Sequence, residues 1–255
     1  MKLPASVQES LYRLGIFARI LVAVGGFARN RHVSLRVLIM QIYFTFFQAM
    51  GIAAMLALGI GAAVSLIGFP FLQMIGQQQF IYTILIIVVT RELGPLLIAF
   101  IIIARSATAI ATEVAGMVIS HEVEAYVSIG IDPIEHLAVP RFLGVTVSLL
   151  LLNVFFSVFG LAGSFVIVRI FHPLPAAYYF GNLLESFAAW DIGMVVLKSI
   201  AFGMIISTIA IIEGLNVERA STEVPVAGLR AVTKSFGACI AVNIVLSALF
   251  YVALI

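Results

Sequence analysis

The sequence predicts an all-α membrane protein, in which an N-terminal amphipathic interfacial helix precedes five transmembrane helices. Of the 255 residues, 63% are hydrophobic and only 10% are charged. Soluble domains carry roughly 25% charged residues, so too few polar side chains are present here to cover a soluble fold. Five apolar stretches are each long enough to cross the ~30 Å hydrocarbon core of a bilayer as a helix.

The five apolar stretches define the expected spans of a single domain, 1–255. They cover residues 37–69, 80–104, 142–168, 192–212 and 235–255. The first stretch exceeds the length of one perpendicular span and is followed by Pro70, so it is expected to tilt, to break near Gly59 or Gly61, or to project into water. Small side chains recur along it every four residues and predict a face for close helix packing; they are Ala49, Ala53, Ala57, Gly61 and Ser65.

Residues 1–36 form a basic segment with six Lys and Arg side chains. It lacks the apolar core and small-residue cleavage site of a secretory signal peptide. Apolar residues, among them Leu14, Ile16 and Ile20, alternate with Arg13 and Arg19. This pattern favours an amphipathic helix on the membrane surface over the alternative of a disordered basic tail.

The placement of Lys and Arg predicts the orientation in the membrane. Eleven basic residues fall on one side: six in the N-terminal segment, Arg105 and Arg141 in the next loop, and Arg219, Arg230 and Lys234 in the loop after the fourth span. The opposite side has Arg169 alone. Positive loops face the cytoplasm, so the N-terminus is expected inside and the C-terminus outside.

Arg91, Glu92 and Lys198 are charged residues inside expected spans. A charge at the bilayer centre costs at least about 2.5–3.5 kcal/mol, so such residues face a partner or a wet cavity. Pro95, after Gly94, removes a backbone donor and clashes with the carbonyl of Arg91, which predicts a helix kink there. Arg91 and Glu92 are interpreted either as a site that contacts or gates substrate or as a buried salt bridge that fixes packing. Lys198 either shares a cavity with Glu92 or snorkels outward.

The segment 105–141 is expected to be a cytoplasmic coupling loop. Glu113–Ile129 is compatible with a helix that ends at Gly130, and Asp132 before Pro133 is a good start for a second helix. Glu122 and Glu124 bring negative charge to an otherwise basic side. This favours docking of a cytosolic protein, with a solvated surface helix as the alternative.

Signatures of enzymes and metal sites are missing from the sequence. His121-Glu122 opens a metalloprotease-like pattern, but Ala125 stands where the second His would be needed. No P-loop occurs, so this chain is expected neither to bind ATP nor to be an enzyme. The single Cys239 excludes an internal disulfide and a Cys-based metal cluster. The net charge of +2 gives no general affinity for nucleic acid.

The region from Thr90 to Leu143 combines RELGP, a following Arg-small-x-x-A segment, an acidic mid-loop helix and GIDPIEHLAVPR. This combination resembles the MlaE/YrbE permeases of ABC transporters that work with MCE proteins, and the resemblance extends over nearly the whole chain. It implies an ATP-driven permease that moves phospholipid between the inner membrane of a bacterium and the periplasm or outer membrane. The implied partners are a second permease copy, a cytosolic ABC ATPase that binds ATP and Mg²⁺, a periplasmic MCE hexamer and a small STAS-domain protein.

The resemblance also implies roles for individual residues. Arg91 and Glu92 match the family's intramembrane charged pair, and Lys198 matches its lysine in the fourth span. Glu122 matches the acidic residue of the helix that docks the ATPase. Some members have an Asp in the last span where this sequence has Asn243. Since an uncharged Asn cannot close an ion pair, a complete charged network is not expected.

Two other classes of function compete with this prediction. One is an ion-coupled secondary transporter with Glu92 as the titrating group, against which the near absence of other membrane carboxylates argues. The other is a scaffold that only anchors an MCE protein, in which changes at Glu122 and Arg91 would be silent.

Overall fold

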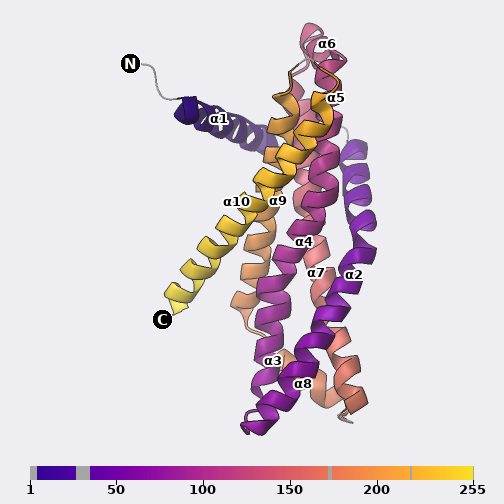
Figure 1. Cartoon of the computed structure of the whole chain (residues 1–255), viewed down its shortest axis with the longest axis vertical. Helices are drawn as coiled ribbons and strands as arrows, with labels where there is room; N and C mark the ends of the chain where they lie inside the picture. The colour runs from indigo at the N-terminus through magenta and orange to yellow at the C-terminus, as the bar shows by residue number, and fades with distance from the viewer. Residues whose placement is uncertain (1–4, 27–34, 172–173, 219, 255) are drawn as a thin grey trace. The chain divides into compact units, whose positions relative to one another are not determined.

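The structure is a computed structural model that describes residues 5–26, 35–171, 174–218 and 220–254. These residues form helices joined by turns, with no strand among them (Figure 1). The α-helices are α1 (Ala5–Gly26), α2 (Leu35–Met74), α3 (Phe80–Leu85), α4 (Gly94–Ile102), α5 (Thr108–Ile119), α6 (Glu122–Ser128), α7 (Val139–Phe171), α8 (Ala176–Ser186), α9 (Ala189–Leu215) and α10 (Glu223–Leu254). Three π-helical segments are η1 (Ile86–Leu93), η2 (Ile103–Ala107) and η3 (Ile134–Ala138).

Within the described residues, five helices are long and apolar enough to cross a membrane, which confirms the predicted fold class. They cover Leu35–Met74, Phe80–Ile119, Ile134–Phe171, Ala189–Leu215 and Glu223–Ala253. All five are longer than the apolar stretches that predicted them, because the helices continue into more polar sequence. The expectation that Pro70 ends the first span was wrong, since α2 runs through it to Met74.

Most of the predicted coupling loop 105–141 is helical and extends the long helices on either side of it. Residues 105–119 continue the second long helix, and residues 134–141 already belong to the third. The predicted Glu113–Ile129 helix is interrupted at His121, which has a left-handed backbone with φ 61°. A turn at Gly130, φ 80°, follows α6 as expected, and the Asp132 carboxylate accepts a 2.9 Å hydrogen bond from the backbone N–H of Ile134.

The fold comprises two compact units, each built from three parts of the sequence. The first contains the described residues of 1–45, 102–147 and 203–239. The second contains those of 46–101, 148–202 and 240–255.

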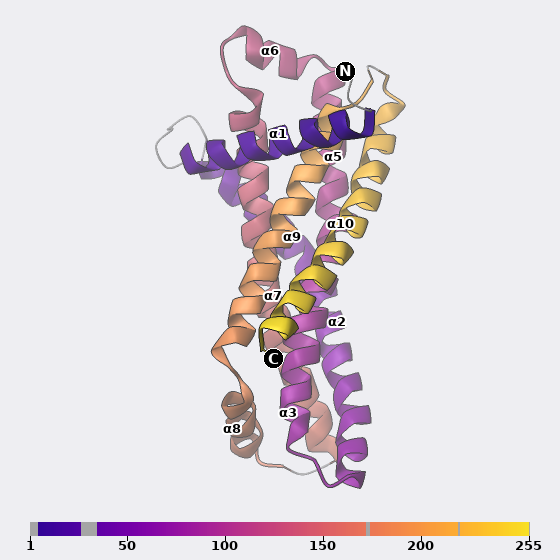
Figure 2. The same cartoon turned by 90° about the vertical axis from the view of Figure 1, so that its left-hand side faces the viewer.

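In the first unit, α1 confirms the helix predicted near the N-terminus and lies across α9 (Figure 2). Ile16 and Ile20 are buried, whereas Leu14 and Val22 are exposed, so apolar side chains occupy more than the packed face. Arg19 donates a 3.2 Å hydrogen bond to the Asp132 carboxylate, which ties α1 to the segment that follows α6.

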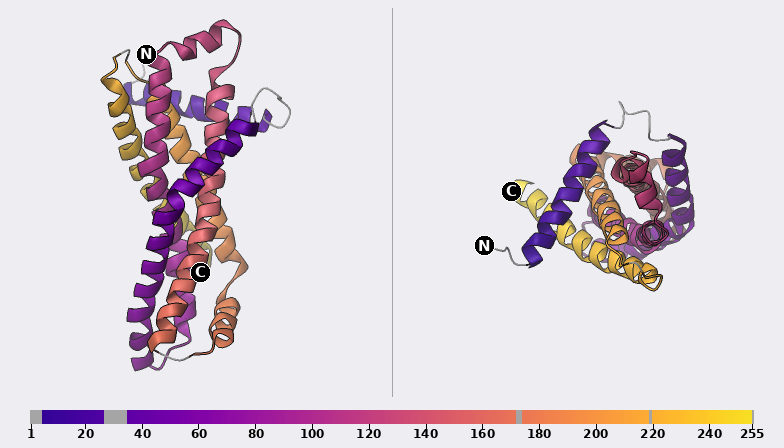
Figure 3. Two further views of the ribbon diagram at one scale, coloured as in Figure 1. Left: turned by 90° about the vertical axis from the view of Figure 1, so that its right-hand side faces the viewer. Right: turned by 90° about the horizontal axis from the view of Figure 1, so that it is seen from above.

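In the second unit, α2 crosses α7 through the stripe of small side chains (Figure 3). A Cβ atom added at Gly61 would lie 1.9 Å from the carbonyl oxygen of Gly160, so only glycine permits this approach. Ala53 and Ala57 on the same face are fully buried. The break considered near Gly59 or Gly61 does not occur, and the stripe serves helix packing within the chain.

A buried charged cluster as candidate functional site

The site begins with a π-helical turn in the second span, where the sequence predicted a kink at Gly94 and Pro95. The backbone N–H of Gly94 donates to the carbonyl of Val89, five residues earlier. Pro95 has no N–H to offer the carbonyl of Arg91. Lys198 supplies a donor instead, since its Nζ lies 3.3 Å from that oxygen. Wide π-turns of this kind are frequent at functional sites.

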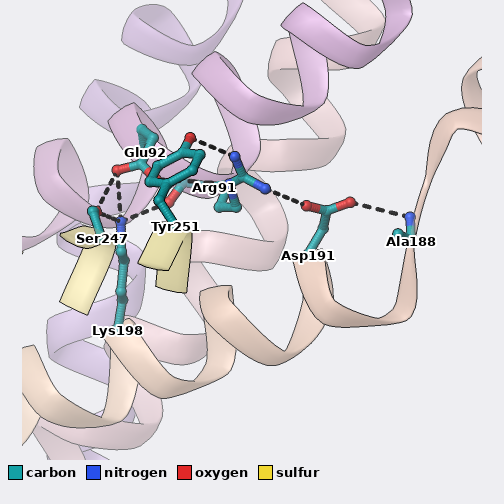
Figure 4. Close-up of polar contacts among 7 residues, drawn as sticks. All are labelled: Arg91, Glu92, Ala188, Asp191, Lys198, Ser247 and Tyr251. Atoms are coloured by element: carbon teal, nitrogen blue, oxygen red, sulfur yellow. Dashed lines mark hydrogen bonds and ion pairs between the residues drawn. The ribbon is translucent and has the colours of Figure 1, made fainter. Parts of the chain in front are cut away.

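Lys198 is fully buried and pairs with Glu92 (Figure 4). Its Nζ donates to Glu92 Oε2 at 2.7 Å and to the Ser247 hydroxyl at 2.8 Å. That hydroxyl in turn donates to Glu92 Oε2 at 2.8 Å. Of the two interpretations of Lys198, outward snorkelling was therefore wrong, because the ammonium group turns inward to a carboxylate.

Arg91 is also buried, and it binds two groups that sequence reasoning did not select. Its Nη1 donates to Asp191 Oδ1 at 3.1 Å and its Nη2 to the Tyr251 hydroxyl at 2.5 Å. The guanidinium carbon lies 4.9 Å and 5.1 Å from the ring centroids of Phe250 and Tyr251. These contacts add a cation–π component to the ion pair.

Asp191 escaped sequence analysis because it stands one residue before the apolar stretch assigned to the fourth span. In the structure α9 begins earlier, at Ala189, and Asp191 is only 4% exposed. Its second oxygen accepts a 3.1 Å hydrogen bond from the backbone N–H of Ala188, which satisfies a donor at the start of α9. An acidic residue in the first turn of a helix was the available signal. The expectation that no complete charged network forms was also wrong: Asp191, not residue 243, supplies the second carboxylate.

The neighbouring side chains of Arg91 and Glu92 form a long ion pair but no hydrogen bond with each other. Arg91 Nε and Glu92 Oε1 lie 3.7 Å apart, and in the described structure neither atom has a hydrogen-bond partner. Two cations and two carboxylates make the cluster formally neutral, yet one donor and one acceptor remain unsatisfied side by side. A group that both donates and accepts, such as a water molecule, could bridge them.

The second set of predicted site residues lies on α6 and is exposed. Glu122 accepts a 3.1 Å hydrogen bond from the Ser120 hydroxyl, and Glu124 lies 2.8 Å from His121 Nδ1. α6 has no buried residue. Val127, within α6, and Ile129, just after its end, are both exposed. Acidic and apolar side chains are thus presented together on one short helix, outside the unit that holds the charged cluster.

Comparisons with known proteins assign the chain to a family. The fold and its buried charges define a multi-pass α-helical membrane protein. The sequence model of the family described as "Permease MlaE" matches residues 38–249. The chain therefore belongs to the MlaE permease family.

Individual relatives agree with this assignment. A probable ABC transporter permease protein of Rickettsia prowazekii is 25% identical over 217 residues, which cover 85% of this chain and 84% of the relative. One from Synechocystis is 29% identical over 176 residues, covering 69% and 67%. The intermembrane phospholipid transport system permease protein MlaE of Haemophilus influenzae is 20% identical over 216 residues, covering 84% and 82%. A permease of an ABC transporter works with an ATPase partner.

Proposed function

We propose that this chain is the membrane subunit of an ATP-driven transporter that moves phospholipid between a bacterial inner membrane and the periplasm or outer membrane. Membership of the MlaE family and the phospholipid transport named for the Haemophilus relative support the substrate. The observation that carries the proposal is the buried cluster of Arg91, Glu92, Asp191 and Lys198. Intramembrane charges of this kind mark substrate pathways more often than they stabilise a fold.

Arg91, Glu92 and Lys198 act in this proposal as a gate that meets the lipid phosphate. Each cation is held by a carboxylate, at 3.1 Å and 2.7 Å, so phosphate gains access only when an ion pair opens. Tyr251 and Ser247, both from α10, cover the two cations. A displacement of α10 would uncover Arg91, whose planar guanidinium suits bidentate binding of phosphate.

Force for this displacement comes from the partner ATPase, docked on α6. Glu122 and Glu124 attract basic side chains of the partner, and Val127 adds an apolar contact. One continuous helix, Phe80–Ile119, carries Arg91 and Glu92 and ends just before α6. ATP and Mg²⁺ bind to the partner, and the nucleotide-driven movement of α6 is transmitted along this helix.

The remaining features of the proposal rest on the family resemblance and on the Lys and Arg pattern. The N-terminus faces the cytoplasm and the C-terminus the periplasm. A second copy of the chain completes the permease, a periplasmic MCE hexamer receives or delivers the lipid, and a small STAS-domain protein joins the ATPase.

Transport by the reconstituted complex tests the role of the cluster. Arg91→Ala and Glu92→Ala are expected to abolish most transfer of labelled phospholipid between vesicles, while the ATPase still copurifies. Arg169→Ala is the matched control, because Arg169 is exposed at the end of α7. Unimpaired transfer by both cluster variants would remove the pair from the mechanism.

One observation favours a second candidate, an ion-coupled secondary transporter. The structure buries Asp191 beside Arg91, which supplies a membrane carboxylate in addition to Glu92. This hypothesis requires that the purified chain on its own moves a substrate when an ion gradient is applied. The ATP-driven proposal requires that nothing moves until the ATPase and ATP are added.

A further inference from the structure

Two cavities of the second unit meet at the ring of Phe69. One, of about 280 Å³, lies between α2 and α7. The other, of about 540 Å³, lies among the end of α2, α3 and α8. Their volumes together are in the range of small-molecule sites. Neither includes a residue of the charged cluster, so this groove is separate from the proposed gate.

The cavity between α2 and α7 is apolar apart from one hydroxyl group. Leu66, Ile167 and Val168 line it. Ser65 lines it as well and is 1% exposed, and its Oγ has no hydrogen-bond partner within the part of the chain that the structure describes. Pro70 has no N–H for the carbonyl of Leu66, which leaves that oxygen without its usual α-helical donor. Because Ser65 is buried against the neighbouring helices, its hydroxyl does not open onto the cavity, and the surface that an occupant meets there is apolar.

The cavity beyond Phe69 is lined by amides and phenols. Gln73, Gln78, Gln79 and Asn182 each offer an amide with two donor hydrogens and one acceptor oxygen. Tyr82 and Tyr178 add phenolic groups and aromatic faces. Among the described lining residues of both cavities there is no charged side chain.

An aromatic network packs beside Phe69, where the two cavities meet. The ring of Phe69 packs edge-on against Tyr82 at 6.4 Å, and Tyr82 packs against Tyr179 at 5.4 Å. The buried hydroxyl of Tyr179 lies 2.5 Å from the Ser164 hydroxyl. Figure 1 shows α3 and α8, which carry the two tyrosines, side by side.

Both walls of the groove change from apolar to amide-bearing in the same direction. Along α2, successive turns present Leu66, Phe69 and then Gln73. On the opposite side, Val168 of α7 gives way to Asn182 of α8. Such a gradient matches a molecule with an apolar chain at one end and hydrogen-bonding groups at the other.

We propose that this groove binds a neutral glycerolipid whose headgroup carries hydroxyl groups, such as a monoacylglycerol. The acyl chain lies between α2 and α7, and the ester and headgroup oxygens form hydrogen bonds with the amides beyond Phe69. An anionic phospholipid fits less well, because a phosphate prefers a cationic partner and the described lining provides none. The proposal goes beyond the transport function and does not depend on it.

Photolabelling of the full-length chain in lipid nanodiscs tests this site. The probe is a monoacylglycerol with a diazirine in its acyl chain, and a phosphatidic acid with the same chain is the anionic comparison. The neutral probe is expected to label the peptides that contain Ser65 to Phe69 or Ile167 to Val168. Unlabelled monoacylglycerol should compete, and phosphatidic acid should not.

Two pairs of variants locate the headgroup and the chain. The double variant Gln78→Ala with Gln79→Ala is expected to lower labelling about tenfold, since each lost hydrogen bond costs a few-fold in affinity. Gln77→Ala, next to the cavity but not in its lining, should leave labelling unchanged. Val168→Phe should block the chain, whereas Val166→Phe, on an exposed position of α7, should not. Circular dichroism and gel filtration establish that all variants fold.

Three results would overturn the proposal. The first is equal or stronger labelling of these peptides by phosphatidic acid. The second is an effect of Gln77→Ala as large as that of the double variant. The third is a groove filled by a copurified protein helix that excludes the neutral probe.

Discussion

The buried charged cluster and α6 carry the same kinds of side chain in opposite surroundings. Lys198 is fully buried, and 2.7 Å separate its ammonium nitrogen from Glu92. On α6, the side chain of Glu124 is 57% exposed. Buried charges act on one another within the chain, whereas exposed charges are available to a partner. Substitutions in the two places should therefore separate damage to the fold and gate from damage to docking.

The largest loss of stability is expected from Lys198→Met. It removes the ammonium group that pairs with the half-buried Glu92 and that contacts the carbonyl of Arg91. Removing one partner of a buried ion pair costs about 3–5 kcal/mol, and Glu92, being 24% exposed on its side chain, places this case at the lower end. Thermal unfolding in detergent should show a clear fall in melting temperature, and lipid transfer should be lost.

The double variant Lys198→Met with Glu92→Gln sharpens this prediction. Because it removes both charges, it should regain much of the stability that the single change loses. It should not regain lipid transfer. A double variant no more stable than Lys198→Met would show that the two side chains do not act as a pair.

A smaller loss of stability is expected for Asp191→Asn. The amide oxygen can still accept the backbone N–H of Ala188, and Arg91 keeps Tyr251 as a partner. The amide then turns its NH2 group toward Arg91, so both the charge and the acceptor that face Arg91 disappear; this should cost about 1.5–3 kcal/mol, the range for a hydrogen bond to a charged group. Asp191→Ala, which also removes the acceptor for Ala188, should unfold at a lower temperature than Asp191→Asn; the reverse order would contradict this assignment.

On α6, Glu122→Gln combined with Glu124→Gln should leave the melting temperature unchanged. Both carboxylates are exposed, and exposed charges contribute little to stability. Copurification of the ATPase should fall, and binding by the unchanged chain should weaken as salt is raised. Glu185→Gln on α8, another exposed acid, is the control. A destabilised α6 variant with intact ATPase binding would contradict the comparison.

The smallest effect on stability is expected at Tyr179, a buried residue outside both the charged cluster and α6. Burial raises the pKa of Tyr179 from 10.0 to about 12, although its hydrogen bond with Ser164 acts in the opposite direction. Between these two values the unfolded chain loses the phenolic proton while the folded chain keeps it, so stability falls as pH rises from about 10 to about 12. Tyr179→Phe should unfold with a weaker dependence on pH in this window, as followed by circular dichroism.

The architecture could be predicted from sequence because its signals are local. Five long apolar stretches and an amphipathic start specify the helices without knowledge of their partners. The helix ends could not be predicted, since residues 105–119 are helical through chain continuity and packing rather than apolar composition. The interruption at His121 had only a weak local signal, because a left-handed backbone is uncommon outside glycine even though histidine adopts it more often than most residues.

The candidate site was predictable in part, for a similar reason. Arg91, Glu92 and Lys198 stand out because they are charged residues in apolar sequence. Asp191 lies at the edge of such a stretch, where acids are common, so only the fold reveals that it faces Arg91. Tyr251 is an ordinary residue near the end of a span, and its role depends on a contact between residues 160 positions apart.

The most direct test of the gate uses a photo-crosslinking amino acid at position 251 of the assembled transporter. Tyr251 covers Arg91, whereas its neighbour Val252 is 73% exposed on α10 and serves as the control. Crosslinking of phospholipid at position 251 should change several-fold between the nucleotide-free and ATP-bound states, while crosslinking at 252 stays constant. If nucleotide leaves phospholipid crosslinking at 251 unchanged, the charged cluster does not gate lipid.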